Sequence, residues 1–116
     1  MECRQLGSDG PEIPVLGFGA WGISGKMGSI SRKQAEIVMN AALDAGFTFI
    51  DTAESYARSE SVIGKVIQGR RDGLFLATKV SGDQSSNHMT YALESSLKNL
   101  KTDYGKNCVR DYYTNL

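Results

Sequence analysis

The chain has 116 residues, a length that suits one domain with a modest hydrophobic core. Its 13 basic and 13 acidic residues cancel, which argues against the basic face expected of a protein that binds nucleic acid. No apolar run approaches the roughly 20 residues that cross a bilayer, so we expect no membrane span.

The first 46 residues predict a hairpin, a strand and a helix. The segments "CRQLG" (3–7) and "EIPVLG" (12–17) flank the turn sequence "SDG" and predict a β-hairpin. Residues 15–19 then predict a short buried strand, which a Gly-rich loop follows. The first helix should begin near Ser31, because Ser31 and Gln34 fit a capping box. Its predicted inner face consists of Ala35, Val38, Met39, Ala42 and Leu43.

The middle of the chain repeats the alternation of strand and helix. Residues 47–50 and 74–80 are continuous apolar runs, which predict buried strands. Ser59 is a candidate cap for a second helix, and residues 86–100 predict a third. Strands that alternate with helices indicate a parallel sheet. The predicted inner face of the third helix consists of Met89, Leu93, Leu97 and Leu100.

The end of the chain departs from this alternation. A fourth strand is due after residue 104, but residues 105–116 contain no apolar run. Arg110 and Asp111 stand where buried residues would be expected. We therefore expect residues 105–116 to be irregular.

The loop "GFGAWG", residues 17–22, matches the G-x-G-x-x-G pattern of dinucleotide-binding turns. That turn needs a helix to open at once, and here the predicted helix begins about nine residues later. Either a loop that a cofactor touches or a simple turn of small residues explains the pattern. A small nucleotide-binding α/β domain is therefore the weakest of the functional alternatives.

Asp51, Tyr56 and Lys79 form the main candidate site. Asp51 ends one predicted strand, Lys79 ends the next, and parallel strands bring such ends to one edge of the sheet. A phenol gives up its proton reluctantly near neutral pH, and a nearby ammonium stabilises the phenolate. A carboxylate beside the ammonium keeps it charged. The alternative is a turn-capping aspartate beside a solvated lysine.

The remaining candidate ligands suggest no metal site. Cys3 and Cys108 stand at opposite ends of the chain, which fits neither a disulfide framework nor a metal-binding spacing. A reducing, cytoplasmic setting is the expectation. His88, the single histidine, is expected to be exposed or to cap a helix, and we assign it no role.

Five motifs together resemble the aldo-keto reductase family. They are "RQLG" (4–7), "VLGFGAWG" (15–22), "FIDTAESYARSE" with "VIGKVI" (49–67), "LFLATKV" (74–80) and "LESSLKNLKTDY" (93–104). The resemblance covers residues 1 to about 104 and implies the N-terminal part of a (β/α)8 TIM-type barrel. That part would hold a hairpin, which closes the barrel's bottom, and about three βα units.

The resemblance also implies an activity. Family members reduce aldehydes and ketones with NADPH, and a tyrosine protonates the carbonyl oxygen. Tyr56 matches that acid, with Asp51 and Lys79 in support. Three further residues, together with Asp51, match the positions beside the cofactor: Gly19, Ala20 and Trp21.

The same resemblance leads us to expect an incomplete enzyme. The family's catalytic histidine should fall near position 111, where Asp111 stands, and the later strands and the segments that hold the adenosine phosphate are missing. A frameshift after Tyr104 or a short isoform would explain the change. We expect the chain alone to be inactive, marginally stable and prone to self-association through open sheet edges. A non-catalytic fragment or interaction module is the main alternative.

Overall fold

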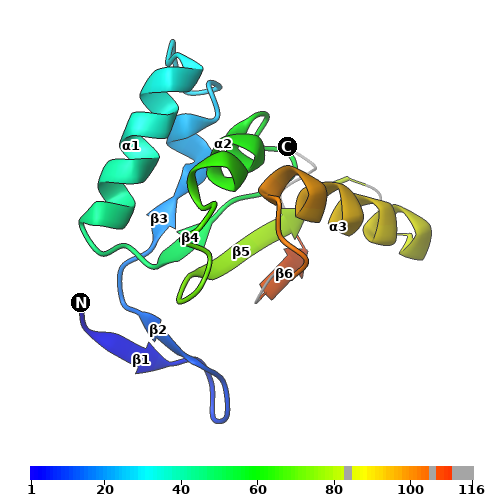
Figure 1. Cartoon of the computed structure of the whole chain (residues 1–116). Helices are drawn as coiled ribbons and strands as arrows, with labels where there is room; N and C mark the ends of the chain where they lie inside the picture. The colour runs from blue at the N-terminus through cyan, green and yellow to red at the C-terminus, as the bar shows by residue number, and fades with distance from the viewer. Residues whose placement is uncertain (83–84, 105–106, 111–116) are drawn as a thin grey trace.

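The computed structural model describes residues 1–82, 85–104 and 107–110 (Figure 1). The predicted alternation of strands and helices is confirmed in these residues. The elements in chain order are β1 (Cys3–Gln5), β2 (Glu12–Pro14), β3 (Phe18–Gly19), the 3-10 helix η1 (Ala20–Ile23), α1 (Arg32–Asp44), β4 (Phe49–Asp51), α2 (Ser59–Val66), β5 (Phe75–Val80), α3 (Ser86–Leu100) and β6 (Asn107–Arg110).

The strands form a small hairpin and a larger parallel sheet. β1 and β2 pair antiparallel, as predicted, and the sheet has the order β3-β4-β5-β6 with parallel neighbours. The helices α1, α2 and α3 lie on one side of the sheet (Figure 1). Ile50 of β4 is paired with Leu76 of β5, and both are buried toward the helices. Because side chains alternate along a strand, Asp51 and Lys79 belong to the opposite face.

A hydrophobic core between the sheet and the helices holds these layers together. Each large apolar side chain buried there contributes about 1.5–3 kcal/mol. Phe18, Ile30, Leu43 and Val66 pack against its edge. The buried members are Ala20, Ile23, Ala35, Met39, Ile50, Val62, Ile63, Ile67, Leu74, Leu76 and Leu100.

Two predicted inner faces are wrong in part. Val38 is 42% exposed, because α1 buries only the narrow stripe of Ala35, Met39 and Ala42. Leu93 of α3 is exposed as well, because it lies beside the buried stripe of that helix. The members of that stripe are Ala92, Ser96 and Leu100.

The first predicted strand is also shorter than expected. Only Phe18–Gly19 are in β3, and Val15 and Leu16 are exposed in the connection from the hairpin. That connection and the hairpin line a cavity of about 300 Å³ together with Phe49, at the edge where β4 begins. The apolar run at residues 15–19 therefore contains both the connection from β2 and the two residues of β3.

The helix starts are correct for α1 and wrong for α2. Ser31 and Gln34 form the predicted capping box, in which each side chain accepts from the other residue's backbone N–H. The cap residue of α2 is Arg58, and Ser59 is the first helical residue. Ser59 is buried, and its hydroxyl lies 2.6 Å from that of Thr52. Its hydroxyl therefore links the start of α2 to the residue that follows β4.

The prediction of an irregular end is wrong for residues 107–110. These residues form β6, which pairs parallel with β5 from Ala77 to Val80. Ladder pairing uses backbone N–H and C=O groups, which every residue except proline carries in full, so a strand can form without an apolar run. Residues 105–106 and 111–116, which include Asp111, are outside the described residues, so the expectation of an irregular segment is not tested there. Among the described helices, none has the length and apolar character of a membrane span.

Candidate active site

The carboxyl ends of β4 and β5 bring two opposite charges together. The Lys79 ammonium donates to Asp51 Oδ2 at 2.5 Å and to the backbone carbonyl of Thr52 at 2.9 Å. About a fifth of the Lys79 side chain and a third of the Asp51 side chain remain exposed. Exposed ion pairs contribute at most about 1 kcal/mol to stability, so this pair mainly orients the lysine.

Tyr56 lies on the other side of the same ammonium. The Lys79 Nζ atom is 5.1 Å from the centre of the Tyr56 ring, within the range of a cation–π interaction. The Tyr56 ring also contacts Trp21 edge to face, with 5.0 Å between ring centres. The structure therefore brings Asp51, Tyr56 and Lys79 together and adds Trp21 to the group.

The candidate cofactor residues before Trp21 lie at the same edge but differ in exposure. Gly19 of β3 is paired with Asp51 of β4, so its backbone is at the rim. Ala20 is fully buried in the core, so the residue presents no exposed surface to a cofactor. Trp21 is 37% exposed and is the member of this segment that presents a side chain to the rim.

A buried polar network behind the rim was missed by sequence reasoning. Glu60, in the first turn of α2, is 2% exposed and accepts from Thr78 Oγ1 at 2.7 Å. The Asn99 side-chain amide of α3 donates to its other carboxylate oxygen at 3.3 Å. Thr78 precedes Lys79 in β5, so this network fixes the strand that carries the lysine. The only nearby sequence signal was Ser59, the candidate cap of the second helix.

His88 lies in the first turn of α3, and its side chain contacts the loop after β5 and not the ion pair. Its Nε2 atom is 3.0 Å from the Ser81 carbonyl and 3.7 Å from Glu54 Oε1. Its backbone N–H donates to the hydroxyl of Ser85, which caps α3. The ring is half-buried and the cap residue is Ser85, so the expectation that His88 is exposed or caps a helix is wrong.

The alternative of a dinucleotide-binding turn lacks the required geometry. The 3-10 helix η1 follows Gly19 directly, and α1 begins only at Arg32. No α-helix therefore presents its first N–H groups to the "GFGAWG" loop in the described chain, which a pyrophosphate site would need.

The residue after Tyr56 has a strained backbone. Ala57 has φ of +47°, in the left-handed region that costs a residue with a Cβ about 1–2 kcal/mol. Strain of this kind gathers at functional sites. Here it lies directly after the candidate acid Tyr56, in the loop between β4 and α2.

We expect Ala57→Gly to raise the free energy of unfolding by about 0.5–1 kcal/mol, because glycine relieves the strain at some entropic cost. The same change at exposed Ala41, inside α1, should lower it by about 1 kcal/mol. Denaturant unfolding of both variants tests this difference in sign. Equal destabilisation by the two changes would contradict it.

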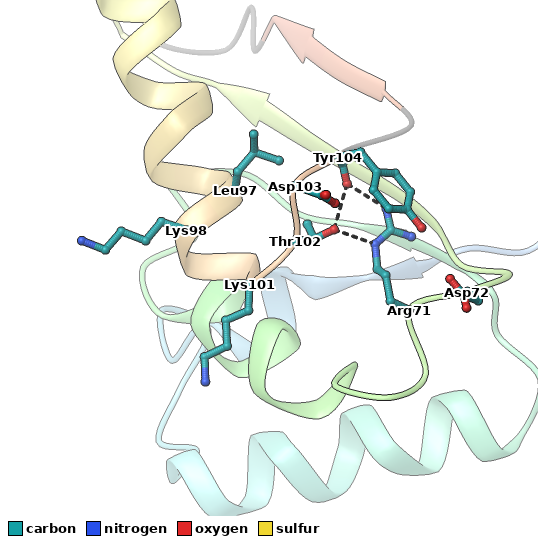
Figure 2. A pocket seen from close by; sticks show the side chains of 8 residues that line it. All are labelled: Arg71, Asp72, Leu97, Lys98, Lys101, Thr102, Asp103 and Tyr104. Carbon is teal, nitrogen blue, oxygen red and sulfur yellow. Dashed lines mark hydrogen bonds between the residues drawn. The ribbon is translucent and has the colours of Figure 1, made fainter.

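A separate cavity of about 520 Å³ lies at the opposite edge of the sheet, where β5 and β6 begin (Figure 2). Arg71 donates to Thr102 Oγ1 at 3.1 Å and to the Tyr104 carbonyl at 2.9 Å, and its guanidinium stacks on the Tyr104 ring. These contacts join the loops at the amino ends of the strands. In (β/α)8 barrels, residues at this end usually contribute to stability and not to catalysis.

Parallel βα units with polar side chains at the carboxyl ends of their strands are typical of α/β proteins, a class that includes the (β/α)8 barrels. A protein-family sequence model described as "Aldo/keto reductase family" matches residues 15–109 of the chain. The chain therefore belongs to the aldo/keto reductase family. The match extends past residue 104, where the predicted resemblance ended.

Known relatives agree in sequence and in fold. Aldo-keto reductase YhdN of Bacillus subtilis (strain 168) is 38% identical over 118 residues, which cover 90% of this chain and 36% of that protein. The crystal structure of the thermostable aldo-keto reductase Tm1743 superposes with a TM-score of 0.82 and 38% identity, over 90% of this chain and 40% of that one. An aldo-keto reductase from Klebsiella pneumoniae in complex with NADPH superposes with a TM-score of 0.81 and is 31% identical. This match covers 100% of this chain and 42% of that one.

These comparisons confirm the predicted fold class. The parallel sheet, open at both sides in the described residues, corresponds to part of the (β/α)8 barrel of the structural relatives. The chain spans about a third of the length of YhdN. The activity of a whole barrel is therefore a matter of proposal for this chain.

Proposed function

We propose that this chain carries part of the active site of an NADPH-dependent reductase of aldehydes and ketones, with Tyr56 as the general acid. The observation that carries the proposal is the position of the Lys79 ammonium, 2.5 Å from Asp51 Oδ2 and 5.1 Å from the Tyr56 ring centre. A phenol beside a cation that is itself held by a carboxylate is suited to donate a proton.

Each of the three residues has a separate part in the proposed reaction. Tyr56 gives its hydroxyl proton to the carbonyl oxygen as the carbonyl becomes an alcohol. Lys79 stabilises the phenolate that remains, because its positive charge faces the ring. Asp51 and the Thr52 carbonyl fix the ammonium in this place through two hydrogen bonds.

The residues at the rim fit a nicotinamide cofactor. The exposed part of Trp21 offers an aromatic face for stacking, and the exposed part of Asp51 offers an acceptor for an amide or hydroxyl group. NADPH, when bound, supplies the hydride. Known structures of relatives contain this cofactor, which supports its choice.

NADPH oxidation with a panel of aldehydes tests the proposal. We expect little turnover by the 116-residue chain, which spans only part of its relatives' barrel. The same chain joined to the C-terminal part of a family barrel, called here the completed barrel, should oxidise NADPH when aldehyde is added. A folded completed barrel that binds NADPH but reduces no aldehyde would contradict the proposal.

The outer edges of the sheet favour a second candidate, an interaction module. In the described residues, β3 and β6 each pair on one side only, which leaves backbone N–H and C=O groups available. We expect the 116-residue chain to associate with itself through these edges. Light scattering across a range of concentrations checks the expectation, and a monomer with a cooperative thermal transition would contradict it.

A further inference from the structure

Lys26 makes a contact across two loops that the proposed function does not use. It lies between η1 and α1, and its Nζ atom donates to the backbone carbonyl of Ser55 at 2.9 Å. The same atom is 5.6 Å from the centre of the Trp21 ring. Ser55 directly precedes Tyr56, so the hydrogen bond joins the Trp21 loop to the loop that carries the proposed acid.

The contact completes a row in which two aromatic rings lie between two positive charges. Lys26 faces Trp21, Trp21 meets Tyr56 edge to face at 5.0 Å, and Tyr56 faces Lys79 at 5.1 Å. Each neighbouring pair in this row is attractive, since a cation is drawn to a ring face and two rings favour the edge-to-face arrangement. The Tyr56 ring is thus held between Lys79 on one side and a Trp21 that Lys26 holds on the other.

A second contact joins the same loops in the opposite direction. The Arg58 guanidinium, from the Tyr56 loop, donates to the backbone carbonyl of Ile30. Gly25 makes room for it: a Cβ there would be 2.9 Å from Arg58 Nη2, and Gly25 has φ of +87°. In the described part of the chain Lys26 has no carboxylate within 4.0 Å, so its charge is directed at the carbonyl and the indole ring.

We propose that Lys26 is a positioning residue that fixes Trp21 against Tyr56 and so orients the phenol. The inference rests on the proposed role of Tyr56 as the acid, but the contact itself stands on the geometry of Lys26, Trp21 and Ser55. Without the ammonium, Trp21 loses the group that covers one of its faces, and the Tyr56 ring loses a fixed neighbour.

Trp21 is the only tryptophan of the chain, so its fluorescence reports this contact without any turnover. In the 116-residue chain we expect Lys26→Met, which keeps the aliphatic stem, to lower the fluorescence anisotropy of Trp21. Acrylamide quenching should rise and the near-UV circular dichroism of the Trp21–Tyr56 pair should weaken. Lys26→Arg should restore all three, because a guanidinium also donates to a carbonyl and stacks on indole.

Lys33→Met is the matched control, because Lys33 is an exposed lysine of α1. It should leave the Trp21 signals unchanged. Identical Trp21 signals in the wild type and Lys26→Met would overturn the proposal, and so would an equal change in Lys33→Met.

Kinetics of the completed barrel separate this inference from the proposed function. We expect Lys26→Met to lower kcat by about two- to fivefold with little change in KM, the loss that one exposed cation–π contact implies. If the completed barrel has no reductase activity but Lys26→Met still changes the Trp21 signals, the proposed reaction is wrong and the Lys26–Trp21 contact stands. If Tyr56→Phe abolishes aldehyde reduction but Lys26→Met leaves kcat unchanged, the proposed reaction stands and the positioning role of Lys26 is wrong.

Discussion

Replacement of Tyr56 by phenylalanine in the completed barrel should lower kcat for aldehyde reduction by a factor of about 10²–10⁴. General acid catalysis by a well-placed side chain contributes about this much to a reaction rate. The change removes one hydroxyl and keeps the ring, so the contacts of Tyr56 with Trp21 and Lys79 should remain. NADPH affinity should therefore change little, which a fluorescence titration can measure beside the kinetics.

Tyr91→Phe provides the matched control for this loss. Tyr91 is 70% exposed on α3, so the same chemical change there should leave kcat and KM at their wild-type values. If Tyr56→Phe reduces aldehydes as fast as the wild type, Tyr56 is not the acid. If both variants lose activity equally, the loss reflects tyrosine removal in general and not proton transfer at the site.

Gly64→Ala should strongly destabilise the packing of α2 against α3. Gly64 is buried in α2, and a Cβ at this position would lie 2.2 Å from the backbone carbonyl oxygen of Asn99 and 2.7 Å from the backbone of Leu100. Two helix backbones must then move apart, because neither neighbour is a flexible side chain. Overpacking of this kind costs about 1–3 kcal/mol or more, which exceeds the gain of about 1 kcal/mol in helix propensity.

Thermal unfolding of the completed barrel measures this effect. A net loss of about 2 kcal/mol should lower its Tm by roughly 3–4 °C, because the shift per kcal/mol falls as a domain becomes larger. Gly22→Ala is the control, because Gly22 lies in η1 and an added Cβ there meets no atom within 4 Å. A Gly64→Ala variant as stable as Gly22→Ala would show that α2 and α3 do not touch in this way.

Local signals predicted the regular elements of this fold well. The third helix was expected at residues 86–100, where α3 lies, and the capping box at Ser31 marks the start of α1. Both depend on residues within one or two turns of each other. The 3-10 helix η1 was missed, because so short an element has no apolar period of its own.

Burial was harder to predict than the elements themselves. Periodicity shows which side of a helix faces inward but not how wide the contact is, and Val38 lies just beyond the buried stripe of α1. β6 was missed for a related reason. Its pairing with β5 depends on backbone groups, which a search for apolar runs does not detect.

The candidate site was partly predictable because the topology of the sheet determines where Asp51 and Lys79 lie. Asp51 and Lys79 end neighbouring parallel strands, and that fact alone puts them at one edge. Lys26 could not be found in this way, since its partner is a backbone carbonyl 29 positions away. Glu60 was not singled out from the sequence, because nothing local indicates that it is buried against Thr78.

A double-mutant cycle on Tyr56 and Lys79 in the completed barrel tests the central claim most directly. The claim is that the lysine acts through the tyrosine, so kcat/KM for an aldehyde should fall no further in the Tyr56→Phe, Lys79→Met double variant than in the worse single variant. Residues that act as a unit are strongly non-additive in such cycles. Losses that multiply would show that the two side chains act independently and would contradict this account of the site.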